Sequence, residues 1–345
     1  MKEEKNVSIF PYNGKQYLHN IAFDSQKYKG FETTIFVFLK NFLKKRNINI
    51  NTYDVVTKKV PFRYVYFDAP YPWNFDAWKT ILFNRKKNIL ICNESSLIIP
   101  FNYWKVFHLF FTKVFTWYDP LIDNKRYFRM RLPKSSIGIN TLPKKFTEKK
   151  FLILINANKL PFYPFKLFNL FGKELYSERI KSIEFFESKV PDKFYLYGRG
   201  WNKPKKNNLS ELIFGYKKYM TYKGEVDDKI ELLSNFKYCL CFENLTDVNG
   251  YITEKIFDCL KAKCIPIYWG ATDIEKYIPK NCFIDFRDFG SYKKLLDFLN
   301  LIDEDAYNNY IKNIEKLLLD KKFRDTWFED GFANFFLKDI LKIKN

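Results

Sequence analysis

The chain has 345 residues, 47% of them apolar, so it is long enough for two domains and too apolar for intrinsic disorder. Its 59 Lys and Arg residues against 39 Asp and Glu give a formal net charge of +20. This charge favours an anionic partner: a nucleic acid, a phosphorylated small molecule or an acidic membrane surface. The sequence contains no RRM, helix-turn-helix or zinc-finger signature, so we expect no nucleic acid partner.

The first half alternates strand-like runs with segments of helical length. We expect helices at 31–45, 75–86 and 103–111, and strands at 7–10, 52–56, 64–68, 89–92 and 114–117. Such a βαβ succession is typical of a parallel sheet covered by helices. A stretch rich in Pro, Ser, Gly and Lys at 133–150 then interrupts the pattern and is interpreted as a linker.

The alternation resumes in the second half. Helices are expected at 174–187, 228–235 and 252–261, and strands at 151–156, 194–197, 238–242, 264–269 and 283–286. The remainder, from Ser291 onward, is expected to be helical. We therefore predict an α/β protein with two Rossmann-like domains, at 1–145 and 146–320, and a helical tail at 321–345.

The tail carries more apolar residues than one exposed helix face tolerates. We expect it to pack back toward the N-terminal domain, and the cations between its apolar residues leave peripheral membrane contact as the alternative.

Cysteine, histidine and hydropathy patterns limit the other possibilities. The six cysteines lie mostly in apolar runs and form no CxxC pair, which is typical of buried thiols in a reducing compartment. Only two histidines are present, so a histidine-rich metal site is excluded and we expect no metal ligands. No apolar run is long enough to span a bilayer, and no signal peptide is evident, so we expect a cytoplasmic protein, peripheral to a membrane at most.

The region 238–271 has the form of a ligand site in an α/β sheet. A strand at 238–242 leads into a polar loop at 243–250 and a helix that begins near Tyr251. Glu254 and Lys255 fall in the first turn of that helix, where a carboxylate suits sugar hydroxyls and a lysine suits a diphosphate. The alternative is that Glu254 complements the helix dipole and Lys255 is solvated. Neither GxGxxG nor GxxxxGK[ST] is present.

Three segments carry a family resemblance: the tripeptide FEN at 242–244, GYITEKI at 250–256 and IPIYWG at 265–270. Together they closely resemble the donor-binding motif of the α-1,3/α-1,4-fucosyltransferases, glycosyltransferase family ten, with a slightly longer loop than in some bacterial members. The resemblance continues more weakly from about residue 88. It implies a GT-B enzyme with two Rossmann-like domains facing a central cleft, inverting transfer from GDP-fucose, and no required cofactor or metal.

The resemblance also implies roles for residues of the second domain. Asn244, Tyr251, Glu254 and Lys255 are expected to bind the donor, and Glu254 is also a catalytic candidate. Arg199, in the segment FYLYGRGW, resembles the family's phosphate-contacting basic residue at a strand end. Lys203 is its rival, and the alternative is that Arg199 is a surface turn residue.

An inverting displacement also needs a base that takes the acceptor proton. Glu94, in the segment ILICNESS, resembles the glutamate assigned as base in bacterial members of the family. Its alternative role is to cap the following turn, in which case the base would be Asp119, Asp123 or another carboxylate of the N-terminal domain.

The function predicted from these residues is transfer of fucose from GDP-fucose to a glycan hydroxyl, on an oligosaccharide or glycoconjugate. The expected linkage is α-1,3 to N-acetylglucosamine or a similar sugar. Two alternatives stay open: another GDP-sugar donor on the same fold, and a non-enzymatic basic protein that binds membranes or nucleic acid.

Overall fold

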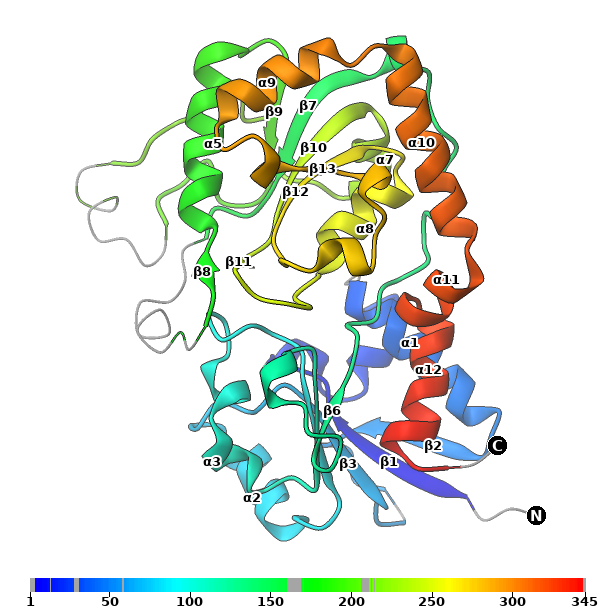
Figure 1. The fold of residues 1–345 in the computed structure, drawn as a ribbon. Coiled ribbons are helices and arrows are strands. Elements are labelled where there is room, and N and C mark those ends of the chain that lie inside the picture. The colour runs from blue at the N-terminus through cyan, green and yellow to red at the C-terminus, as the bar shows by residue number, and fades with distance from the viewer. Residues whose placement is uncertain are drawn as a thin grey trace. The chain divides into compact units, whose positions relative to one another are not determined.

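The structure of the chain is a computed structural model. It describes residues 4–12, 14–27, 31–57, 59–159, 169, 171–205, 211, 213 and 215–343, with the backbone alone for 31–33. The chain divides into two units (Figure 1). Unit 1 comprises Met1–Ser136 together with Arg324–Asn345, and unit 2 comprises Ile137–Phe323. The expected linker at 133–150 contains the first of these divisions.

Unit 1 is built on a parallel sheet in the order β2-β1-β3-β4-β5-β6. Strand β4 has no exposed residue, as expected for a parallel sheet covered on both faces. The strands are β1 (Lys5–Phe10), β2 (Ile48–Thr52), β3 (Arg63–Phe67), β4 (Asn88–Cys92), β5 (Lys113–Thr116) and β6 (Tyr127–Arg129). The helices within residues 1–136 are α1 (Phe31–Lys44), α2 (Phe75–Phe83) and α3 (Lys105–His108), with a 3₁₀ turn η3 at Pro100–Tyr103.

The predicted strand at 52–56 is wrong. The observed strand is β2 at Ile48–Thr52, which alternates buried and half-buried residues at the edge of the sheet. Its asparagines conceal the β pattern because asparagine is depleted in strands. A turn follows it, with the Val55 N–H donating to the Thr52 carbonyl at 3.0 Å, and Val56 is 97% exposed.

Two helix predictions in unit 1 are also corrected. The helix expected at 75–86 ends at Phe83, where the N–H of Asn84 donates to the Ile81 carbonyl. The helix expected at 103–111 is instead the turn η3 followed by the single-turn helix α3. Pro100 opens η3, as suits the first turn of a helix, and the helix α3 begins only after Trp104.

The C-terminal residues complete the core of unit 1. Helix α11 (Lys321–Trp327) crosses the division, and α12 (Glu329–Phe335) and a π-helical turn (Phe336–Ile340) follow it. Phe332, Phe336 and Leu337 are at most 5% exposed within this core. The Phe332 ring lies 6.4 Å from that of Phe67. These tail side chains are therefore not available to a membrane; residues 344 and 345 of the expected tail lie outside the described part.

Unit 2 contains a second parallel sheet in the order β13-β12-β10-β7-β9. The strands are β7 (Lys150–Ile155), β9 (Phe194–Tyr197), β10 (Phe236–Phe242), β12 (Ile265–Trp269) and β13 (Ile284–Asp285), and β8 (Lys173–Glu174) pairs with β11 (Leu245–Thr246). The helices are α5 (Tyr176–Lys189), α7 (Lys229–Ser234), α8 (Glu254–Lys261), α9 (Tyr292–Leu301) and α10 (Glu304–Leu319).

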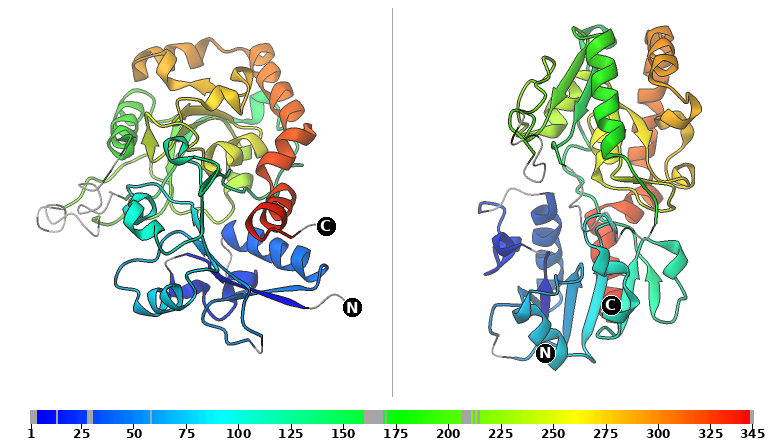
Figure 2. Two further views of the ribbon diagram at one scale, coloured as in Figure 1. Left: turned by 60° about the horizontal axis from the view of Figure 1, so that its bottom comes forward. Right: turned by 90° about the vertical axis from the view of Figure 1, so that its left-hand side faces the viewer.

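The strand order of unit 2 determines where a ligand site is expected. Strand β7 comes first in the sequence and lies between β9 and β10. The next strand of this sheet, β9, is added on one side of β7, and the later strands β10, β12 and β13 are added on the other side, so the strand order reverses at β7. Ligands of open α/β sheets bind outside the carboxyl ends of the strands at such a switch point. Helix α8 packs on β10 and β12, while α5 and α9 pack against each other (Figure 2).

All six cysteines are free and buried, which confirms the part of the cysteine prediction that concerns burial and pairing. Across the part of the chain that the structure describes, no helix combines the length and the apolarity needed to cross a membrane.

Candidate active site

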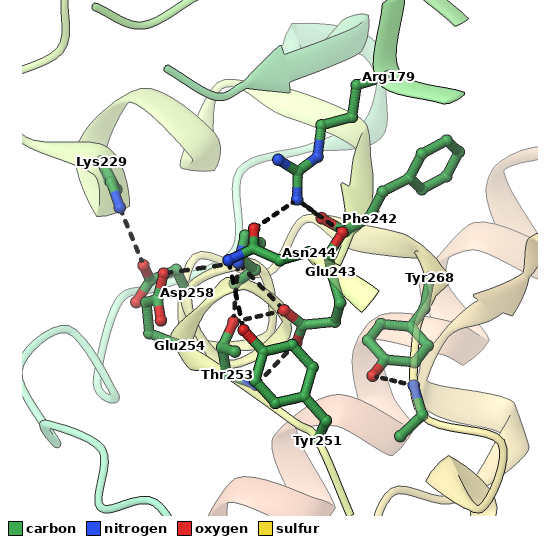
Figure 3. Close-up of polar contacts among 12 residues, drawn as sticks. Arg179, Lys229, Phe242, Glu243, Asn244, Tyr251, Thr253, Glu254, Asp258 and Tyr268 are labelled. Atoms are coloured by element: carbon green, nitrogen blue, oxygen red, sulfur yellow. Dashed lines mark hydrogen bonds and ion pairs between the residues drawn. The ribbon is translucent and has the colours of Figure 1, made fainter. Parts of the chain in front are cut away.

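The centre of the site is a buried glutamate directly after β10. Glu243 is 0% exposed, and its Oε1 accepts a hydrogen bond of 2.7 Å from the backbone N–H of Thr253. Its Oε2 accepts from Thr253 Oγ1 at 2.6 Å and from Lys255 Nζ at 3.1 Å (Figure 3). Thr253 is the N-cap of α8, and its hydroxyl makes no capping bond to the helix. The carboxylate therefore ties the end of the strand to the start of the helix.

Lys255 is held as a cation by this arrangement. Burial works to lower the pKa of its ammonium group, but the Glu243 carboxylate, helped by Glu254, outweighs it and raises the pKa above its ordinary value. Lys255 Nζ lies 4.0 Å from a carboxylate oxygen of Glu254, and the Glu254 side chain is 35% exposed. The structure thus brings these two predicted site residues together in the first turn of α8, with Glu254 facing solvent in part.

A second buried cation, which the sequence did not identify, contacts the end of β10 and the loop after it. Arg179 of α5 is 5% exposed, and its Nη2 donates to the carbonyls of Phe242 and Glu243 at 2.8 and 2.6 Å. The same nitrogen donates to Asn244 Oδ1 at 2.9 Å. Burial lowers the pKa of Arg179, yet a guanidinium stays protonated. No local pattern marks Arg179, because the residues it binds are more than 60 positions away in sequence.

Asn244 and Tyr251, two of the predicted donor-binding residues, contact each other. Asn244 Nδ2 donates to the hydroxyl of Tyr251 at 3.3 Å, and Tyr251 is only 1% exposed. Gly250 has φ +77°, and its N–H donates to Asp273 Oδ1 at 2.7 Å. The loop is therefore fixed at both ends, by Arg179 near Asn244 and by Asp273 at Gly250.

Gly270, after β12, leaves the space that Glu243 occupies. A Cβ at this position would lie 2.5 Å from Glu243 Cγ and still closer to the hydroxyl of Tyr268. The Tyr268 hydroxyl cannot easily withdraw, because it accepts a hydrogen bond of 3.0 Å from the Ala271 N–H. The glycine at the end of the IPIYWG segment is thus required by the position of the buried carboxylate.

Arg199 lies elsewhere on the sheet. It follows β9, the edge strand separated from β10 by β7, and its side chain is exposed. Its carbonyl accepts from the Asn158 N–H at 2.8 Å. Lys203, its rival, is exposed as well. Arg179 and Lys255 thus contact the loop after β10, and a phosphate contact by Arg199 stays a prediction.

Glu94 belongs to unit 1 and follows β4 at the carboxyl edge of that sheet. Its N–H donates to Asp68 Oδ1 at 2.8 Å, and the same oxygen accepts from the Asn93 N–H and from Asn102 Nδ2, both at 2.6 Å. The Glu94 carbonyl accepts from the Tyr103 hydroxyl at 2.8 Å. These bonds use the backbone of Glu94 and fix the direction in which the chain leaves the strand.

The other two carboxylates considered as bases have firm partners. Asp119 lies 2.6 Å from Arg129 Nη1. Asp123 Oδ1 accepts from the backbone N–H groups of Lys125, Arg126 and Tyr127 at 2.8 to 2.9 Å, and these bonds lower the pKa of its carboxyl group. Asp123 is therefore a poorer proton acceptor than a carboxylate without such hydrogen bonds.

Asp68 accepts hydrogen bonds from the backbone of Asn93 and Glu94, so its titration tests how this segment is held. Asp68 is 0% exposed, its φ is +68°, and its Oδ2 is buried with no hydrogen-bond partner among the described residues. Burial raises its pKa to about 6, although the hydrogen bonds from Glu94, Asn102 and Asn93 act in the opposite direction. The pKa of Asp68 is higher in the folded state than in the unfolded state. Its contribution to the free energy of unfolding is therefore complete below about pH 4 and is lost as the pH rises through about 6.

We predict that Asp68→Asn removes this loss, since Asn keeps an acceptor oxygen and tolerates a left-handed backbone. Relative to the unmodified protein, the variant should gain about 3 kcal/mol of unfolding free energy between acid and neutral pH. Urea unfolding on both sides of about pH 6 measures this difference. Asp123→Asn is the control, because its pKa is shifted in the opposite direction. A stability gap for Asp68→Asn that does not change with pH would contradict the assignment.

Comparison with known proteins supports the same region. Residues 179–329 match the C-terminal model of glycosyltransferase family 10 (fucosyltransferase). The α-(1,3)-fucosyltransferase FucT of Helicobacter pylori is 34% identical over 96 residues, which are 28% of this chain and 20% of that protein. The chain thus spans about a fifth of the length of the curated relative that it matches.

Solved structures extend the likeness to both units. A crystal structure of an α1,3-fucosyltransferase covers 100% of this chain and 92% of its own, with a TM-score of 0.58 at 18% identity. The structure of WaaG, a glycosyltransferase involved in lipopolysaccharide biosynthesis, matches 96% of this chain and 99% of its own chain, with a TM-score of 0.53 at 8% identity. The chain therefore has the GT-B fold, and its residues 179–329 are similar to glycosyltransferase family 10, the fucosyltransferases.

Proposed function

We propose that this protein is an inverting glycosyltransferase that transfers fucose from GDP-fucose to a hydroxyl group of a glycan. The observation that carries the proposal is the buried Glu243 carboxylate, which holds Lys255 at the start of α8. This place, outside the carboxyl end of β10, is where α/β sheets bind ligands. It also lies within the part of the chain that matches the fucosyltransferase family.

Lys255 and Arg179 bind the diphosphate of the donor in this proposal. Both are cations that contact Glu243 of the loop after β10, Arg179 from α5 and Lys255 from α8, and the N-terminal end of α8 adds a partial positive charge. Arg179 Nε is buried and has no hydrogen-bond partner among the described residues, so it keeps a donor for a phosphate oxygen. Fixed cations stabilise the negative charge that develops on departing GDP.

Glu254, Asn244 and Tyr251 contact the sugar or ribose. Glu254 is the partly exposed carboxylate of the site, and carboxylate oxygens accept hydrogen bonds from hydroxyl pairs. Asn244 and Tyr251 already bond to each other, so their remaining donors and acceptors are held in one orientation.

Glu94 acts as the base. It takes the proton of the acceptor hydroxyl while that oxygen bonds to C1 of fucose and the bond from C1 to the phosphate oxygen breaks, which inverts C1. The acceptor we propose is N-acetylglucosamine or a similar sugar of an oligosaccharide, fucosylated at the 3-hydroxyl. This linkage rests on the α-(1,3) activity named for the relative from Helicobacter pylori.

We predict that Glu94→Gln lowers turnover by roughly 10² to 10⁴-fold while GDP affinity stays within a few-fold of the original. Lys255→Ala should weaken GDP binding as well as turnover, because its charge meets the diphosphate in the ground state and in the transition state alike. Calorimetry with GDP and a radiolabelled transfer assay with GDP-fucose and N-acetyllactosamine measure the two effects.

Lys293→Ala is the control for Lys255→Ala, since Lys293 is an exposed cation of the same unit. Asp123→Asn is the control for Glu94→Gln. Turnover within a few-fold of normal in Glu94→Gln would show that Glu94 is not the base. If the protein binds GDP and transfers a sugar from another GDP-sugar but not from GDP-fucose, the proposed donor is wrong and the proposed site is correct.

The two cations also predict how the enzyme responds to chelators. Because Lys255 and Arg179 take the place of a metal on the diphosphate, transfer should proceed at an unchanged rate in EDTA. The same transfer assay after dialysis against EDTA tests this. Complete loss of activity that manganese restores would contradict the role of the cations.

A further inference from the structure

Helix α2 of unit 1 presents large apolar side chains to solvent. Phe75, Leu82 and Phe83 are 79%, 53% and 79% exposed. Their spacing of seven and eight residues places them on one face of the helix. Ala77 and Ile81, on the other face, are fully buried in unit 1. Apolar residues scattered singly on a surface are ordinary, but three on one face of a nine-residue helix are not.

The neighbouring helix α3 enlarges this surface. Val106 and Leu109 are 59% and 58% exposed. Figure 1 shows α2 and α3 next to each other in unit 1. They are in contact through Trp78 of α2, whose ring lies 5.4 Å from that of Phe107 and 5.6 Å from that of Phe110. We call the exposed side chains of these two neighbouring elements the α2–α3 surface.

Cations lie among these apolar residues. Lys79 is four residues after Phe75 and so shares its helix face, and three more exposed cations flank the helices: Arg85, Lys86 and Lys105. Asp76 is the exposed carboxylate of α2. The α2–α3 surface therefore combines apolar side chains with an excess of positive charge.

We propose that the α2–α3 surface docks on an anionic phospholipid membrane. Phe, Leu and Val side chains enter the boundary between headgroups and acyl chains, while lysine and arginine contact lipid phosphates. A protein partner fits less well, because lysine is depleted in the cores of protein interfaces. The apolar side chains of the C-terminal tail are buried in unit 1, so membrane contact belongs to this surface instead. The proposal is independent of the catalytic function.

The experiment is co-sedimentation of the full chain with large unilamellar vesicles. Vesicles of equal parts phosphatidylcholine and phosphatidylglycerol should bind the protein, vesicles of phosphatidylcholine alone should bind it at least roughly tenfold more weakly, and added salt should release it. Absence of binding to the anionic vesicles, or equal binding to both kinds, would overturn the proposal.

Variants locate the contact. Leu82→Ser with Phe83→Ser, and separately Lys79→Ala with Lys86→Ala, should each reduce binding to the anionic vesicles roughly tenfold or more. The matched control is Leu301→Ser with Leu319→Ser, two side chains of unit 2 that are 81% and 75% exposed, and it should bind as the original does.

Thermal melting and calorimetric GDP binding confirm that each variant is folded. If the control pair loses binding as strongly as the α2–α3 pairs, or if those pairs bind normally, the surface is wrongly assigned. Sedimentation velocity tests the other occupant: a dimer that Leu82→Ser with Phe83→Ser dissociates would assign the surface to a second copy and overturn the membrane proposal.

Discussion

A carboxylate that is removed from water must be paired with a cation and hydrogen-bonded. The site after β10 is organised around such a carboxylate, that of Glu243. Burying an unpaired charge costs several kcal/mol or more. The two oxygens of Glu243 accept from the Thr253 N–H, the Thr253 hydroxyl and Lys255 Nζ at 2.6 to 3.1 Å. The first turn of α8 cannot leave the strand without leaving this charge unpaired, so Lys255 is held in place before any ligand binds.

Two further residues make the position of Glu243 possible. Gly270 lacks the Cβ that would collide with it, and Arg179 binds the carbonyls on either side of the turn from strand to loop. Contacts within unit 2 therefore hold in place both the loop after β10 and the two cations that contact it, Arg179 and Lys255. A site ordered in advance loses less entropy when it binds, which leaves more of the interaction energy for affinity.

Sequence reasoning succeeded where the signal is local. The apolar run at 194–197 predicted β9 with its observed bounds. Asn244, Tyr251, Glu254 and Lys255 could be proposed as site residues because they lie within one short segment. It failed where the cause is tertiary. Arg179 and Asp68 act on residues distant in sequence, and their neighbours form no motif around them. Arg199 has a clear local signal in its glycine-flanked turn, but it follows an edge strand separated from β10 by β7, so its phosphate contact stays a prediction.

The most direct test of the account is hydrogen–deuterium exchange of the full chain with GDP, with UDP and with neither. If Glu243, Lys255 and Arg179 organise a guanosine diphosphate site, GDP should slow amide exchange in the segments around 242–255 and 176–183, and UDP at the same concentration should slow it much less. Slower exchange confined to segments outside unit 2, or no change around 242–255, would contradict the assignment of the donor site.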